Sequence, residues 1–109
     1  MATSERTMTL IVDQLQEAGA VTAKKMFGEY GLFLDGRMFA MIADERLLFK
    51  PTEAGRRIFP GATYEEPYPG AKPCMLIPPE RWDDPAWLAP LARATAAELP
   101  LPKPRKGKG

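Results

Sequence analysis

The sequence predicts an α+β domain in which an antiparallel β-meander carries an N-terminal helix and a C-terminal helix, both packed on the sheet. Three observations support this fold class. Residues 5–18 have apolar side chains at helical spacing, residues 23–50 form short apolar runs separated by turn signals, and residues 84–99 begin with a helix-start signal.

The first helix is predicted over residues 5–18, with Ser4 as its N-cap and Gly19 at its end. Its apolar side chains recur at helical spacing and form one stripe: Met8, Ile11, Leu15 and Ala18. We expect this stripe to pack on the core.

Four strands are predicted after Gly19, at residues 23–27, 30–34, 37–43 and 46–50. The strongest turn signal is Asp35-Gly36, because a two-residue type I′ turn needs positive φ at both central positions. Asp44-Glu45 is a weaker turn signal. The four strands are therefore expected to follow one another as a meander.

Two-residue turns set the strand register, and the register assigns the side chains to two faces. The predicted core face holds Gly31, Phe33, Met38, Ala40, Ile42, Leu47 and Phe49. The second face holds Tyr30, Leu32, Leu34, Phe39, Met41 and Leu48, with Arg37, Arg46 and Lys50 at its ends. Unless another layer covers them, we expect four of these residues to bind a protein partner, either a regulator or a second copy in a homodimer: Leu32, Leu34, Phe39 and Met41.

A short helical turn is predicted from Thr52, as N-cap, to residue 58. Residues 60–73 are rich in proline and are predicted to form an ordered loop with at most a brief strand. Tyr64, Tyr68 and Lys72 in this loop are the candidate lining of a ligand pocket, although packing of the tyrosines onto the body is the more ordinary reading.

The last strand is predicted at residues 73–77, at an edge of the sheet because Pro73 and Pro78 flank it. Asp84-Pro85 is an N-cap and first-turn pair for a closing helix that runs to about residue 99. Pro90 lies inside this range and predicts either a kink or a later start of the regular helix.

Composition places the chain among single-domain globular proteins: 109 residues, of which 45% are apolar and 27% charged. There is neither an apolar run of membrane-spanning length nor a signal-peptide profile, so we expect a cytoplasmic protein without membrane contact. Cys74 is the sole cysteine and histidine is absent, which excludes an intrachain disulfide and Ser-His or Cys-His nucleophile pairs. No catalytic residue, metal site or cofactor is predicted, and Cys74 is interpreted as a small buried hydrophobe.

The charge is uneven, because the last ten residues, PLPKPRKGKG, contain four bases and no acid. Residues 1–99, the predicted domain, hold 11 basic and 14 acidic side chains, which gives about −3. Residues 100–109 are predicted to be a disordered basic tail that binds nucleic acid weakly through Lys103, Arg105, Lys106 and Lys108. Four such contacts would give a slope of log affinity on log salt of at most about −3.6, and deletion of the tail would abolish the binding.

The glycines of GEYGLFLDG are interpreted as turns and bulges of the meander and not as a phosphate loop, since no helix or Lys-Ser/Thr pair follows them. Glu65-Glu66 and Asp83-Asp84 are adjacent acids, and we interpret them as solvated or capping groups because neighbouring side chains on a strand point to opposite faces.

Several short motifs recur at fixed spacing in the middle of the chain: Met26-Phe27-Gly28, Tyr30-Gly31, Asp35-Gly36, Phe39-Ala40 and residues 47–50. With the Pro-rich loop, Ile77-Pro78 and the closing helix, they make residues 8–97 resemble the N-terminal domain of the TfoX/Sxy family, bacterial regulators of natural competence. The resemblance implies helices packed on a small antiparallel sheet. For full-length regulators it also implies co-activation of competence genes with the cyclic-AMP receptor protein, but those regulators carry a second, helical domain in the place of the basic tail.

The function expected from these observations is a free-standing, non-enzymatic regulatory or adaptor domain that acts through protein contacts. Two alternatives stay open. One is a small-molecule-binding domain or unrecognised enzyme with a pocket at the Pro-rich loop, and the other is weak nucleic-acid binding through the tail.

Overall fold

The computed structural model describes residues 4–26 and 29–100. Its elements follow the chain in this order: α1 (Glu5–Leu15), the 3₁₀ helix η1 (Gln16–Ala18), β1 (Thr22–Met26), β2 (Glu29–Leu34), β3 (Arg37–Ala43), β4 (Arg46–Phe49), α2 (Glu53–Ile58), β5 (Tyr64–Glu65), β6 (Cys74–Ile77), the 3₁₀ helix η2 (Pro79–Arg81) and α3 (Pro85–Glu98). The strands form one antiparallel sheet in the order β1-β2-β3-β4-β6-β5. The α+β class is therefore confirmed, with the first four strands as the predicted meander.

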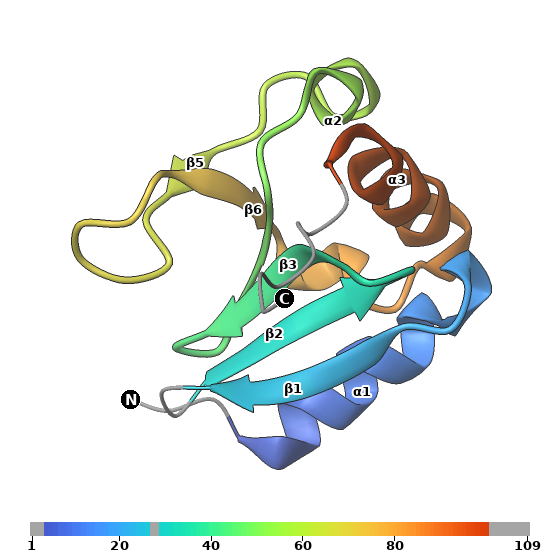
Figure 1. Cartoon of the computed structure of the whole chain (residues 1–109), viewed down its shortest axis with the longest axis vertical. Coiled ribbons are helices and arrows are strands. Elements are labelled where there is room, and N and C mark those ends of the chain that lie inside the picture. Colours follow the sequence, from blue (N-terminus) through green and yellow to red (C-terminus); the bar gives the residue numbers. More distant parts are fainter. Residues whose placement is uncertain (1–3, 27–28, 101–109) are drawn as a thin grey trace, which may run out of the picture.

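The main hydrophobic core lies between the sheet and the two long helices. Ile11 and Leu15 of α1 and Leu88 and Leu91 of α3 have no exposed surface and belong to one buried cluster with the sheet. Figure 1 shows α1 running along β1 and α3 beside the far end of β2 and β3. The helices thus cover one face of the sheet and leave the other without a helical layer.

A β-bulge in β3 changes the predicted assignment of side chains to faces. Leu34 pairs with Arg37 and Phe33 with Met38, as a two-residue turn requires, but Leu32 pairs with Ala40. Phe39 has no partner in β2, so the register slips by one residue there, and a slip of one residue moves side chains to the opposite face.

The prediction for the two faces of the hairpin was therefore wrong in part. Four residues predicted on the second face belong to the core cluster: Tyr30, Leu32, Leu34 and Phe39. Phe33 and Met38, predicted in the core, are only partly buried. Beyond the bulge the prediction is confirmed, since Ala40, Ile42, Leu47 and Phe49 are all buried in the core.

The turns and helix caps follow local chemistry. Asp35 and Gly36 have φ of 54° and 77°, which confirms the type I′ geometry, and Asp44 and Glu45 also have positive φ, of 53° and 60°. Ser4 caps α1 by accepting a hydrogen bond from the Thr7 amide at 3.1 Å. Thr52 caps α2 in the same way, accepting from the Gly55 amide at 3.0 Å.

Three other predicted details differ from the structure. The strand β6 lies between β4 and β5, so the edge strands are β5 and β1 and the predicted edge position was wrong. The pairing of Tyr64 with Met75 and of Glu65 with Cys74 makes this difference, because the brief strand β5 satisfies the free side of β6. The helix α1 ends at Leu15, and η1 occupies the rest of the predicted range before Gly19.

The closing helix begins at Pro85 and continues through Pro90, so the prediction of a later start was wrong. Pro90 lies on the exposed side of α3, where the loss of a backbone donor is least harmful. Asp84 occupies the N-cap position, but its side chain pairs with Arg81 at 3.2 Å and does not cap the helix.

Among residues 4–26 and 29–100, no helix has both the length and the apolar character needed to cross a membrane.

Candidate binding face of the sheet

We call the side of the sheet opposite α1 and α3 the open face. Strand pairing places on it Gly31 opposite Met41, Phe33 opposite Met38 and Leu48 opposite Leu76. Lys24 and Met26 on the edge strand β1 point to the same side as Gly31. Ala43, Leu48 and Cys74 form a small buried cluster of their own, so the accessible strip consists mainly of Phe33 and three methionines: Met26, Met38 and Met41.

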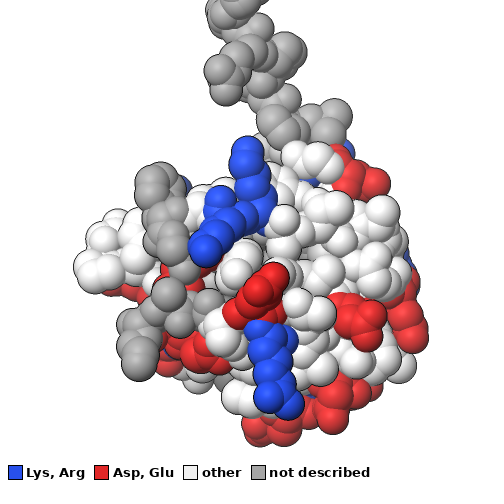
Figure 2. Space-filling view, turned by 90° about the horizontal axis from the view of Figure 1, so that it is seen from below, with Lys and Arg blue, Asp and Glu red and all other residues white. Residues whose placement is uncertain are grey.

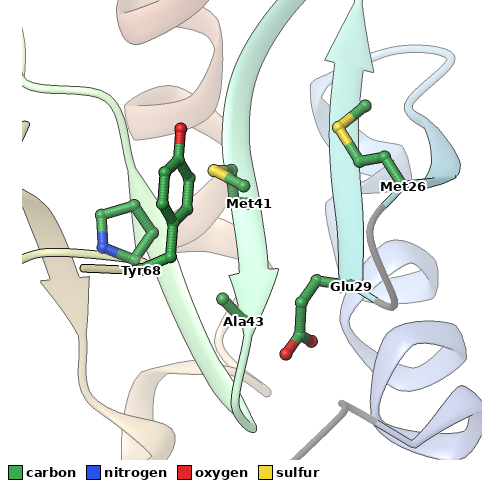
Figure 3. Close-up of a pocket in the computed structure, with 6 residues that line it drawn as sticks. Met26, Glu29, Met41, Ala43 and Tyr68 are labelled. Carbon is green, nitrogen blue, oxygen red and sulfur yellow. The ribbon is translucent and has the colours of Figure 1, made fainter. Parts of the chain in front are cut away.

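One end of the open face contains a pocket of about 510 Å³, which we call the acidic pocket. Its lining comes from β1, β2, β3 and the loop after β5: Met26, Glu29, Met41, Ala43, Pro67 and Tyr68. Figure 3 shows the Tyr68 ring beside Met41, with Met26 and Glu29 on the other side of the pocket. The Glu29 carboxylate accepts a hydrogen bond from the Asp44 amide at 3.1 Å and is the only formally charged group in the lining.

Arg46 holds the loop that forms one wall of the acidic pocket. Its guanidinium donates to the Glu65 carboxylate at 2.9 Å and to the carbonyl oxygens of Glu66 at 3.2 Å and Pro67 at 3.1 Å. Its Nε donates to the Ala43 carbonyl at 3.3 Å. A single side chain on β4 thus links the turn before it to three consecutive loop residues, and the loop places Tyr68 with 57% of its surface exposed.

The other end of the open face contains a shallower pocket of about 270 Å³, which we call the basic pocket. It is lined by Phe33, Gly36, Arg37, Met38, Lys50, Leu99 and Pro100. Two of these residues are basic and none is acidic. Within residues 4–26 and 29–100, the side chains of Arg37 and Lys50 form no hydrogen bond or ion pair, and the Arg37 Nε is buried without an acceptor.

Gly31 joins the two pockets. A Cβ atom at this position would lie 2.8 Å from the Met38 Sδ and 3.0 Å from the Met26 Cε. The missing side chain therefore lets a methionine from each pocket cross the same point of the sheet. The result is a continuous apolar strip with an acid at one end and two bases at the other.

The structure changes the predicted partner-binding set. Leu32, Leu34 and Phe39 are 0%, 4% and 0% exposed, because the bulge turns them toward this chain's own helices, and the prediction that they form an exposed patch was wrong. Met41 does lie on the open face. Nothing in the local sequence marks the bulge, so the predicted patch was placed on the wrong side of β2.

The predicted ligand set is not brought together. Tyr68 lines the acidic pocket, but Tyr64 lies in β5, with its hydroxyl buried and without a partner and its ring 5.4 Å from the Arg56 guanidinium. Lys72 is exposed in the loop and does not line the acidic pocket. The signal that sequence reasoning missed was the alternation of methionine with small residues on β1, β2 and β3.

Cys74 is buried, and burial raises the pKa of its thiol. A thiol in such surroundings is a poor nucleophile near neutral pH, which agrees with its interpretation as a small hydrophobe. Among the described residues no cluster of three potential Cys, Asp or Glu ligands could hold a metal ion. The predicted nucleic-acid contacts, Lys103, Arg105, Lys106 and Lys108, lie outside the described residues.

Figure 2 views the molecule from the side of α1 and β1. Acidic and basic side chains on this side are separated by uncharged ones, and there is no continuous basic surface. A face of this kind lacks the electrostatic footprint of a nucleic-acid interface.

Comparisons with known proteins agree with the fold. Residues 13–99 match the family model of the TfoX N-terminal domain. The chain is also 42% identical over 112 aligned residues to a protein of Spirochaeta aurantia, described as an uncharacterized 12.7 kDa protein in the trpE 5′ region. This alignment covers 99% of the chain and 93% of the relative.

Proposed function

Because this chain belongs to the TfoX N-terminal domain family, which is not a family of enzymes, we propose that it is a non-enzymatic regulatory or adaptor domain acting in the cytoplasm by binding another protein. The observation that carries the proposal is the open face. It presents a continuous apolar strip between two pockets, and no helix of the described chain covers it.

The chemistry of the strip suits protein recognition. Methionine side chains are flexible and polarizable, so they adapt to partners of different shape. Tyr68 adds a half-exposed aromatic side chain with a polar tip, the type of residue enriched at interface hot spots. Arg46 keeps this tyrosine in place, which lowers the entropy lost when a partner binds.

Site-specific photo-crosslinking in the producing cells tests the proposal. Tyr68 is replaced by p-benzoylphenylalanine, and the matched control carries the same residue at Leu10, which is 48% exposed on α1, on the covered side of the sheet. We expect protein adducts from position 68 and not from position 10, and their loss when Met41→Lys is added. Adducts that are equal at the two positions, or that survive Met41→Lys in a folded protein, would refute binding through the open face.

A second candidate function is favoured by the volume and lining of the acidic pocket. About 510 Å³ lies within the range of roughly 300–1,000 Å³ for small-molecule sites, and apolar walls around one carboxylate suit an apolar molecule with a cationic end. Phenethylamine, 2-phenylethanol and phenylacetate are a matched cationic, neutral and anionic series. Methionine methyl NMR signals of Met26 and Met41 should shift most with the amine and much less in Glu29→Gln, and this candidate is excluded if no compound moves them at millimolar concentration.

Weak nucleic-acid binding by residues 100–109 stays a prediction. It concerns a segment outside the open face, and loss of binding on deletion of that segment is its test.

A further inference from the structure

The two ends of the open face carry opposite charge. Glu29 lines the acidic pocket with no lysine or arginine, whereas Arg37 and Lys50 line the basic pocket with no acid. Between them lie the methionines that meet over Gly31. Lys24 projects from the edge strand β1 and lies outside both pockets.

A surface of this kind is complementary to itself. If a second copy is turned by 180° about an axis perpendicular to the open face near Gly31, its basic pocket lies over the acidic pocket of the first copy, and the reverse holds at the other end. Such a two-fold arrangement makes every contact twice, as in an isologous dimer. A partner with charge of one sign would face repulsion at one of the two ends.

We propose that the partner of the open face is a second copy of this chain, docked antiparallel so that Glu29 of each copy faces Arg37 and Lys50 of the other. The inference rests on the proposed function and names the partner of that surface. It gives the Arg37 side chain an acceptor, which this side chain lacks within residues 4–26 and 29–100.

The end of the described chain supports the same partner. Pro100 lines the basic pocket, so residues 101–109, with their four bases, continue from the basic end. Nine residues reach at most about 30 Å when extended, which is enough to pass over the acidic end of a docked copy. The tail charge would then add to the attraction between copies, which salt weakens.

Sedimentation equilibrium with charge-reversed variants tests the dimer. Glu29→Lys and the double variant Arg37→Glu/Lys50→Glu each place like charges at both contacts, so each should raise the dimer Kd roughly tenfold or more. An equimolar mixture restores opposite charges at both contacts and should recover a dimer near the wild-type Kd. Glu80→Lys, a reversal of an exposed residue of η2, is the matched control and should leave the Kd unchanged.

A second measurement does not depend on the folding of Glu29→Lys. Purified protein with p-benzoylphenylalanine at position 68 should give adducts at twice 12.1 kDa, and the crosslinked peptide should contain residues of the basic pocket, 33–38. Crosslinks to the acidic end of the other copy would overturn the antiparallel arrangement.

The dimer is overturned if the wild-type chain stays monomeric at millimolar concentration, or if the mixed variants fail to recover dimerisation. Tighter dimerisation after removal of residues 101–109 would also overturn it, because the tail would then cover the open face of its own copy. These results leave the proposed function intact when position 68 still yields adducts with a different protein in cells, and both ideas fail when it yields none.

Discussion

Two glycines, Gly31 and Gly55, make room for side chains from elsewhere in the chain, but their neighbours differ in stiffness. At Gly31 the nearest atoms are the ends of two methionines, which can move. At Gly55 an added Cβ would lie 2.9 Å from the Thr52 Oγ1 and 3.3 Å from the Met75 Cε. The Thr52 hydroxyl cannot withdraw without losing its hydrogen bond to the Gly55 amide, which caps α2.

We therefore expect Gly55→Ala to destabilise the protein by about 1 kcal/mol. Alanine in place of glycine favours a helix by roughly 1 kcal/mol, but loss of the cap costs about 1 kcal/mol and overpacking against Met75 costs about 1 kcal/mol or more. Urea unfolding followed by circular dichroism measures the difference. In a Thr52→Ala background the same substitution should cost less, and stabilisation by Gly55→Ala in the wild-type background would contradict the steric argument.

At the scale of elements, the bulge in β3 and the loop after β5 decide what the open face contains. The bulge sends Phe33 and Met38 to the open face and Leu32 and Phe39 to the core. The loop has only a two-residue strand of its own, so its position depends on Arg46. The planar guanidinium reaches acceptors on Glu65, Glu66 and Pro67 together, which a lysine ammonium cannot do.

Arg46→Lys should loosen this loop at a modest loss of global stability, about 1 kcal/mol, because the ion pair with Glu65 is partly exposed. Hydrogen exchange of the amides of residues 66–72 should become faster, while exchange in β2 and β3 stays unchanged. The control is Arg57→Lys, a substitution at an exposed arginine of α2. Equal exchange in the two variants would show that Arg46 does not hold the loop.

At the scale of the whole molecule, two exposed carboxylates connect distant helix starts. Glu45, in the turn before β4, accepts hydrogen bonds at 2.6 Å from the Thr7 hydroxyl and from the Ser4 amide at the start of α1. Glu98, at the end of α3, accepts from the Ala54 and Glu53 amides at the start of α2, both at 2.9 Å. These hydrogen bonds lower the pKa of both carboxyl groups.

The lowered pKa values give a direction for the pH dependence of stability. A carboxyl group whose folded pKa is depressed stabilises the protein above its unfolded pKa, about 4.3 for glutamate, and this stability is lost as the pH falls through the folded pKa. We expect the melting temperature to fall below about pH 4.3, and to fall less in Glu45→Gln/Glu98→Gln, which is less stable at pH 7. Calorimetry from pH 7 to pH 3 measures both; Glu80→Gln is the control, and a double variant with the wild-type pH dependence would exclude this origin.

What the sequence determined by itself is the local structure. Asp35-Gly36 specifies the turn because few residue pairs tolerate positive φ twice, and Ser4 and Thr52 specify helix starts because their hydroxyls reach amides three residues away. The TfoX-like motifs added the fold, although not the face on which the fold would be accessible.

Only the tertiary structure decided the bulge at Phe39, the place of β6 between β4 and β5, and the hold of Arg46 on a loop some twenty residues later. Each of these depends on contacts between segments distant in sequence, where one unpaired residue or one long side chain selects among registers that local propensity leaves equal. For the same reason the open face, with its acidic and basic ends, is a property of the folded sheet and of no single stretch of the chain.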